Sequence, residues 1–230
     1  IKYLNKTKKW GIQSQYYSYI DEWRQWWAGY HTSFHRINEC GLDGTHHART
    51  MYRLGMPKRA CEDWAALLLN DKTTVTVTDK NTASWLLSVD AQQTGGILKS
   101  IEFWSNANTL VELAFRSGTG AFVLSLENLV VKDGMAVLSP DAKICLDYDP
   151  AECILPITIR HGRIVDVAFA SEVTVGGKSC IYLQTHRLVL RDGRQQYQIT
   201  NEYFTSENED TENADYKPAP LPAGVLKSFT

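Results

Sequence analysis

The sequence predicts an α+β protein in which helices come first and an antiparallel β-meander follows. Through most of residues 1–120, apolar side chains recur at three-to-four spacing, which is typical of amphipathic helices. From residue 121 onward, runs rich in Val, Ile, Leu and Tyr are separated by Asp-Gly, His-Gly and Gly-Gly dipeptides, which are hairpin signals. We therefore expect a mainly helical part at 1–120, an antiparallel sheet part at 121–206, and an acidic, then Pro-rich linker at 207–230.

The helical part is expected to contain four helices and one short strand. Ser14–Trp27 has a broad aromatic face that includes Trp23, Trp26 and Trp27. A second helix should begin near Pro57 and run to Leu69, with a core stripe of Ala60, Trp64, Leu67 and Leu68. A β-branched run predicts a strand near 73–78, and helical spacing returns at 82–93 and 97–116. Residues 30–50 have no sustained period and predict a long loop.

The sheet part is expected to begin with a strongly apolar strand at 121–126, after the helix stop at Gly118–Gly120. Asp133-Gly134, His161-Gly162, Gly176-Gly177 and Asp192-Gly193 are predicted turns. They leave four long strands at 154–160, 163–175, 179–190 and 195–205. The Asp-Tyr-Asp-Pro segment at 147–150 is interpreted as ordinary turn chemistry.

Composition excludes several classes of protein. A chain of 230 residues can bury a core without disulfides. A net charge of -2 argues against a surface that grips nucleic acid or anionic lipid as a whole, and the basic run Lys6–Lys9 is expected to be a solvated arm. Five Cys without a Cys-x-x-Cys pair indicate neither a disulfide framework nor a zinc ribbon. No apolar run reaches the ~20 residues of a membrane helix.

The segment His31–His47 supplies the most tempting cluster of possible zinc ligands. Its members are His31, His35, Cys40, His46 and His47. Structural zinc sites usually pair ligands two to five residues apart on each side, and only His31 and His35 fit that spacing. Hydrogen-bonded or solvated histidines are therefore the expected state, and a metal-dependent enzyme built on this segment stays an alternative.

The remaining chemistry-bearing residues form no catalytic pattern. Gly118-Thr-Gly120 follows a helix and precedes a strand, the reverse of a phosphate loop. Neighbouring carboxylates at Glu62-Asp63 and Asp147/Asp149 have no partner in the sequence, and no spacing pairs Cys61 or Cys180 with His186. We expect no enzyme activity, no cofactor and no metal. The tryptophans Trp23, Trp26 and Trp27 are candidate subunit contacts.

One segment carries a family resemblance. Arg53–Asp71 places a Lys-rich helix before a short β-branched stretch, with Cys61, Glu62, Trp64, Ala65, Leu67 and Leu68 at the signature positions. Further matches follow in order along the chain, at 20–29, 112–121, 156–157, 182–186 and 197–201. Together these segments resemble the N-terminal, wing portion of siphophage-type portal proteins.

The resemblance implies a structural subunit of a closed ring of about twelve copies at one vertex of a tailed-phage or prophage capsid. Such a ring is the conduit through which double-stranded DNA is packaged and ejected, and it is the head-tail connection point. Implied partners are the major capsid and scaffolding proteins, the terminase packaging motor, a head-tail adaptor, and DNA mainly through later parts of the chain, with no membrane. The implied location is the virion, after assembly in the bacterial cytoplasm.

The same resemblance implies that a stem region would follow Thr230, and the first residue, Ile1, is not a Met. Two alternatives to a portal subunit remain open. One is the metal-dependent enzyme based on His31–His47, and the other is a different phage head or tail structural protein with a helix-plus-sheet body.

Overall fold

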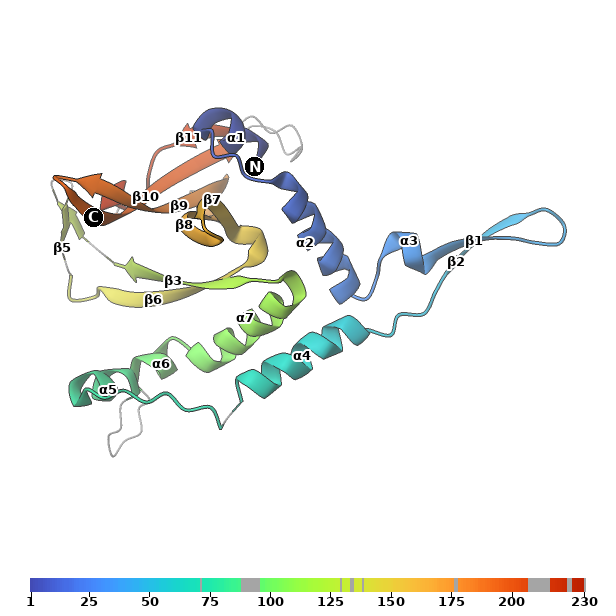
Figure 1. Ribbon diagram of the computed structural model, residues 1–230, viewed down its shortest axis with the longest axis horizontal. Helices are drawn as coiled ribbons and strands as arrows, with labels where there is room; N and C mark the ends of the chain where they lie inside the picture. The colour runs from blue at the N-terminus through green and yellow to red at the C-terminus, as the bar shows by residue number, and fades with distance from the viewer. Residues whose placement is uncertain are drawn as a thin grey trace. The chain divides into compact units, whose positions relative to one another are not determined.

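The computed structural model describes residues 1–70, 72–87, 96–128, 130–132, 135–137, 139–175, 178–206, 216–222 and 225–229. It confirms the α+β class, with helices in the first half and the largest antiparallel sheet in the second (Figure 1). The chain forms two compact units. The helical unit is Gln15–Ala121, and the sheet unit combines Ile1–Ser14 with Phe122–Thr230.

The sheet unit is built on the predicted meander. Its main sheet has the order β11-β10-β9-β8-β7, with β12 also on β10. The strands are β7 Ile154–Arg160, β8 Arg163–Val175, β9 Lys178–Arg191, β10 Arg194–Ser206, β11 Tyr216–Ala219 and β12 Ser228–Phe229. The predicted turns at His161-Gly162 and Asp192-Gly193 are confirmed, because all four residues have positive φ, as a two-residue type I′ hairpin requires. Gly176-Gly177 lies outside the described residues.

The first helix, α1 Lys2–Lys8, packs on one face of this sheet. The Tyr3 ring meets Phe204 edge-on at 5.6 Å, and Lys8 Nζ lies 2.6 Å from a Glu202 carboxylate oxygen. The expectation of a solvated arm at Lys6–Lys9 is therefore wrong for Lys8. The sequence could not show this, because the carboxylate partner is 194 residues away.

Smaller strand pairs complete the sheet unit. β3 Gly120–Glu127 pairs with β6 Lys143–Pro150, and β4 Val130–Lys132 pairs with β5 Met135–Val137. The expected turn at 147–150 is wrong, because these residues end β6, where Pro150 occupies the last position and then a 3-10 turn, η1 Ala151–Cys153, follows. Asp133-Gly134 lies outside the described residues.

The expected linker at 207–230 is only partly a linker. Its described residues include β11 and β12, which both add to β10. Asn201 in β10 forms two hydrogen bonds to the last described segment. Its backbone N–H donates to Lys227 O and its side-chain amide donates to Leu226 O, each at 2.8 Å. Residues 207–215 lie outside the described part.

The helical unit contains α2 Ser14–Trp27, α3 Thr32–His35, α4 Met56–Leu68, α5 Lys80–Leu87, α6 Gly96–Ser100 and α7 Phe103–Ser117. The predictions for α2 and α4 are confirmed. The single helix predicted at 97–116 is instead broken between α6 and α7, where Glu102 adopts φ 51°. The predicted helix at 82–93 corresponds to α5 up to Leu87, and residues 88–95 lie outside the described part.

Two local predictions in this unit are wrong. The run at 73–78 belongs to no strand in the described part of the chain, because β-branched propensity needs a neighbouring strand to pair with. Residues 30–50 are not a plain loop but α3 followed by a hairpin, β1 Arg36–Cys40 and β2 His46–Thr50. Nearly all residues of this hairpin are exposed, so no alternation of polar and apolar residues marks it in the sequence.

Candidate subunit interface

Helices α4 and α7 form an antiparallel pair in the helical unit (Figure 1). The Trp64 ring stacks on Phe115 at 5.7 Å, and the Asn108 side-chain amide donates to Leu69 O at 3.0 Å near the other end. Ala65 and Ala107 are fully buried in this unit. Small side chains at such positions let packed helices approach closely. Gly118, with φ 81°, ends α7 as the sequence predicted.

The outer side of this helix pair is apolar and uncovered. We call Trp64, Leu67, Leu68 and Phe115 the α4 stripe; their exposed fractions are 53%, 68%, 53% and 45%. The prediction that Ala60, Trp64, Leu67 and Leu68 form a core stripe is therefore wrong for the single chain, because all four are exposed. The side of α4 that faces inward instead carries Ala65 and half-buried Cys61.

The α4 stripe exposes a large apolar area. Two half-exposed aromatic rings and two largely exposed leucines present roughly 400 Å² of apolar area, comparable to the largest patch on a typical monomer. Burying that area would contribute about 10 kcal/mol before the entropic cost of association. The stripe is therefore large enough to take part in a subunit contact.

Cys61 and Glu62 also occupy signature positions in α4, but within the described chain both interact with nearby residues of the helical unit. Burial, followed by the nearby Glu112 charge, raises the pKa of the Cys61 thiol, and Arg116 only partly opposes this. A raised pKa keeps the thiol protonated and unreactive at neutral pH. Glu62 lies 3.8 Å from Lys58 one helical turn earlier.

The three tryptophans of α2 have different surroundings. Trp27 lies near two cations, with Lys58 Nζ 4.9 Å and the Arg116 guanidinium 5.4 Å from the centre of its ring. Trp26 stacks on His31 at 4.7 Å. Trp23 is 39% exposed, the most exposed of the three, and it stacks on the exposed Tyr19.

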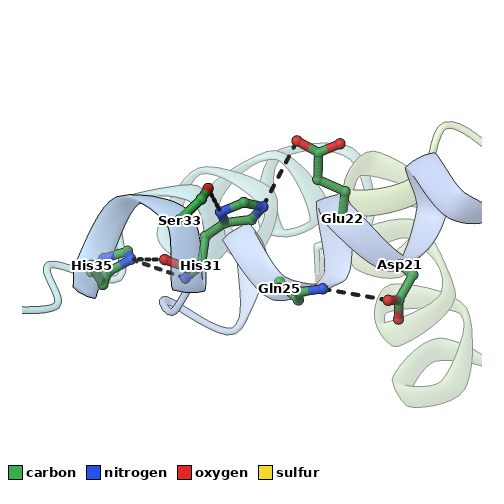
Figure 2. Close-up of polar contacts among 6 residues, drawn as sticks. All are labelled: Asp21, Glu22, Gln25, His31, Ser33 and His35. Atoms are coloured by element: carbon green, nitrogen blue, oxygen red, sulfur yellow. Dashed lines mark hydrogen bonds and ion pairs between the residues drawn. The ribbon is translucent and has the colours of Figure 1, made fainter. Parts of the chain in front are cut away.

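The hairpin β1–β2, which we call the arm, begins directly after His35, and Figure 2 shows the polar contacts of His31 and His35 next to its base. His35 is buried, its Nδ1 accepts the His31 backbone N–H at 2.9 Å, and its carbonyl accepts the Met51 N–H at 2.8 Å. Ser33 Oγ lies 2.8 Å from His31 Nδ1, and a Glu22 carboxylate oxygen lies 3.9 Å from His31 Nε2. These contacts fix the base of the arm.

The structure does not gather the five metal-ligand residues that the sequence offered. His31 and His35 are occupied at the base of the arm, whereas Cys40 and His46 pair across its strands and His47 Nε2 lies 2.8 Å from Thr45 Oγ1. Among the described residues, no three His, Cys, Asp or Glu side chains are grouped for a metal ion. No observation in the described part favours the metal-enzyme alternative.

The sheet unit contains a buried polar row that the sequence did not predict as a unit. The Tyr182 hydroxyl donates to Asn201 Oδ1 at 2.8 Å, and the Gln184 amide donates to the Tyr182 oxygen at 3.0 Å. His186 Nε2 donates to Gln184 Oε1 at 2.9 Å, and its Nδ1 accepts from the Tyr197 hydroxyl at 2.6 Å. Both His186 nitrogens are thus engaged, which leaves none to activate a thiol.

Burial shifts the pKa of several groups in this unit. It raises the pKa of Asp149 to about 6, with a further contribution from the Asp147 charge, and it raises the pKa of Cys153 to about 11. It lowers the pKa of His186. These shifts follow from desolvation of the charged forms and do not pair an acid with a base around a common cavity.

No protein-family model, curated protein or solved structure matches the chain. The structure itself assigns the α+β class and a helical unit with an uncovered apolar stripe. Each helix in the described ranges is too short or too polar to span a bilayer.

Proposed function

We propose that this chain is a structural subunit of the portal ring at one vertex of a tailed-phage or prophage capsid. In this role it is not an enzyme; it contributes to the conduit for double-stranded DNA packaging and ejection and to the head-tail connection. Support comes from the ordered sequence resemblance to siphophage-type portal proteins and from the surface that the signature helix presents.

The observation that carries the proposal is the exposure of the α4 stripe. Trp64, Leu67 and Leu68 are three of the six signature residues, and they remain exposed although helical spacing predicts them to be core. The largest exposed apolar patch on a protein of this kind is often functional. A repeated neighbour would complete the core that the single chain leaves open.

A ring also needs a second, different surface on each copy. Closed rings with more than two members form by head-to-tail contacts between two unlike patches. The arm supplies a candidate for the second patch, because its main contacts within the described chain are between its own strands and with α3. An isolated two-stranded hairpin is marginally stable, so a neighbour that covers the arm would stabilise it.

The proposed partners follow from the same assignment. They are other copies of the chain, the major capsid and scaffolding proteins, the terminase motor and a head-tail adaptor, together with double-stranded DNA passing through the ring. The proposed location is the virion, and no membrane or cofactor takes part.

The test is the mass of the assembly, by native mass spectrometry and class-averaged electron microscopy, on this chain and on the full natural gene product. We expect rings of about twelve copies with a central hole. Leu67→Lys with Leu68→Lys should shift the population toward monomers, whereas Ala66→Lys, at an exposed position outside the stripe, should not. A monomeric or small-oligomeric gene product, or rings without a channel, would contradict the portal assignment.

A further inference from the structure

Cys40 and His46 lie directly opposite each other at the outer end of the arm. The next residues toward the turn are hydrogen-bonded, because the Gly41 N–H donates to Thr45 O at 2.7 Å. Hydrogen-bonded and non-hydrogen-bonded pairs alternate along an antiparallel ladder, so Cys40↔His46 is a non-hydrogen-bonded pair. Side chains stand closest in such pairs, with Cβ atoms about 4.5–5.5 Å apart. The register thus brings a thiol and an imidazole together on one face of the arm.

Both side chains on this face are available to a ligand. Cys40 is an exposed free cysteine, and its thiol makes a weak hydrogen bond of 3.6 Å to the adjacent Gly41 carbonyl. His46 is exposed, and its imidazole forms no hydrogen bond or ion pair with another described residue.

The opposite face of the arm differs, because its polar side chains hold one another. Thr45 Oγ1 lies 2.6 Å from Asp43 Oδ1 and 2.8 Å from His47 Nε2. An Arg49 guanidinium nitrogen lies 2.5 Å from a Glu39 carboxylate oxygen. The two neighbouring histidines of β2 therefore have different surroundings, with His47 engaged and His46 available.

A thiolate and an imidazole at this separation can share one zinc ion. Structural zinc is tetrahedral, with bonds of about 2.3 Å to sulfur and about 2.0–2.1 Å to nitrogen, so two of its ligand atoms lie about 3.6 Å apart. A Cys and a His whose Cβ atoms are about 5 Å apart can reach that separation in staggered rotamers. One arm supplies two of the four ligands, and no third His, Cys, Asp or Glu joins them among the described residues. The site is therefore incomplete in a single chain.

The rest of this face favours a second arm as the source of the other two ligands. Asn38 and Ala48 form the next pair on the same face, so the surface beside Cys40 is uncharged and includes a small side chain. Arg36 lies four residues from Cys40, or about 14 Å along the strand. Two arms can thus stack by this face without like charges meeting at the ion. Stacked sheets lie about 10 Å apart, so an ion midway is about 5 Å from each backbone, within reach of Cys and His side chains.

We propose that Cys40 and His46 from two copies of this chain together bind one Zn²⁺ ion in a Cys₂His₂ site. Cys40 binds as the thiolate, and its proton passes to solvent. The ion stabilises the arm, because a two-stranded hairpin is marginally stable by itself and the free energy of metal binding adds to that of folding.

This inference does not rest on the proposed function, in which no cofactor takes part. The contact uses the same surface on both copies and is therefore two-fold. It joins two copies in addition to any head-to-tail contacts within a ring.

The test is a titration of the chelator-treated full chain with Zn²⁺, followed by isothermal calorimetry and sedimentation velocity. We expect one ion for two chains and a doubling of the mass of the species present. Cys40→Ser and His46→Asn should each weaken Zn²⁺ binding about a hundredfold or more, because even outer-shell partners of metal ligands contribute roughly 10–100-fold. His47→Gln, on the opposite face of the same hairpin, should bind Zn²⁺ as the wild type does.

Substitution of Co²⁺ for Zn²⁺ identifies the ligands by visible absorption. Wild type and His47→Gln should show the spectrum of tetrahedral, thiolate-bound Co²⁺, whereas Cys40→Ser should not. One ion per chain without association, or unchanged binding by Cys40→Ser, would overturn the shared site. Association that a reductant abolishes and a chelator does not would overturn it in favour of a disulfide between the two Cys40 side chains.

Discussion

Replacing Asp149 by Asn should stabilise the sheet unit, and the size of the effect should depend on pH. Burial and the Asp147 charge raise the pKa of Asp149 from 3.8 to about 6. Between these values the folded state holds a proton that the unfolded state releases, so the free energy of unfolding falls as pH rises from 3.8 to about 6 and stays lowered above it. The full shift corresponds to about 3 kcal/mol; because the carboxyl is only half-buried, we expect about 1 kcal/mol.

Urea unfolding at pH 4, 6 and 7.5 measures the difference in free energy of unfolding between Asp149→Asn and the wild type. Hydrogen exchange of β9 and β10 shows whether that difference lies in the sheet unit. Asp149→Asn should match the wild type at pH 4 and exceed it by about 1 kcal/mol at pH 7.5. Asp141→Asn, the same change at an exposed position, should make no difference at any pH. An equal gain at pH 4 and 7.5 would refute the reasoning, because the effect would then not come from burying the charge.

Two further predictions concern packing and the polar row. Ala65→Leu should destabilise the helical unit by about 1–3 kcal/mol, because Ala65 is fully buried against α7; Ala66→Leu, on the exposed side of α4, should be nearly neutral in thermal unfolding. His186→Gln should show a pH-dependent cost. Because burial lowers the pKa of His186, the unfolded chain takes up its proton first, so the wild type's advantage over the variant should shrink as pH falls below about 6.5. A constant difference between pH 7.5 and 5 would contradict a buried neutral imidazole.

Local sequence rules predicted the elements whose signals are themselves local. The Asp192-Gly193 and His161-Gly162 turns define the meander, since a type I′ turn needs only two residues with positive φ. Pro57 near the start of α4 and Gly118 after α7 set helix ends in the same way. These features depend on backbone preferences within a few residues, which a sequence displays directly.

The failures share a different cause, which is that a partner element distant in sequence decides the outcome. The run at 73–78 has the right residues for a strand, but no strand among the described residues pairs with it. Lys8 looks like part of a solvated basic arm until Glu202 is placed beside it. The hairpin of β1 and β2 is the exception: Cys40 and His46 pair although they are close in sequence, and the strands lack alternation because nearly all of their residues are exposed.

The α4 stripe could be predicted from the sequence only in part. Trp64, Leu67 and Leu68 were singled out from the sequence, but only the structure shows that they are uncovered and that Phe115 joins them.

The net charge of -2 explains why charge alone suggested no partner. A net charge sums over the molecule, whereas an antiparallel sheet with strands of about 40 Å can separate acids from bases along its length. Arg191 and Arg194 flank the turn between β9 and β10, whereas the acids at 207–215 follow β10 in the sequence. A chain that is nearly neutral as a whole can therefore still present local charge at short range, because screening removes the long-range field and leaves contacts within about 10 Å.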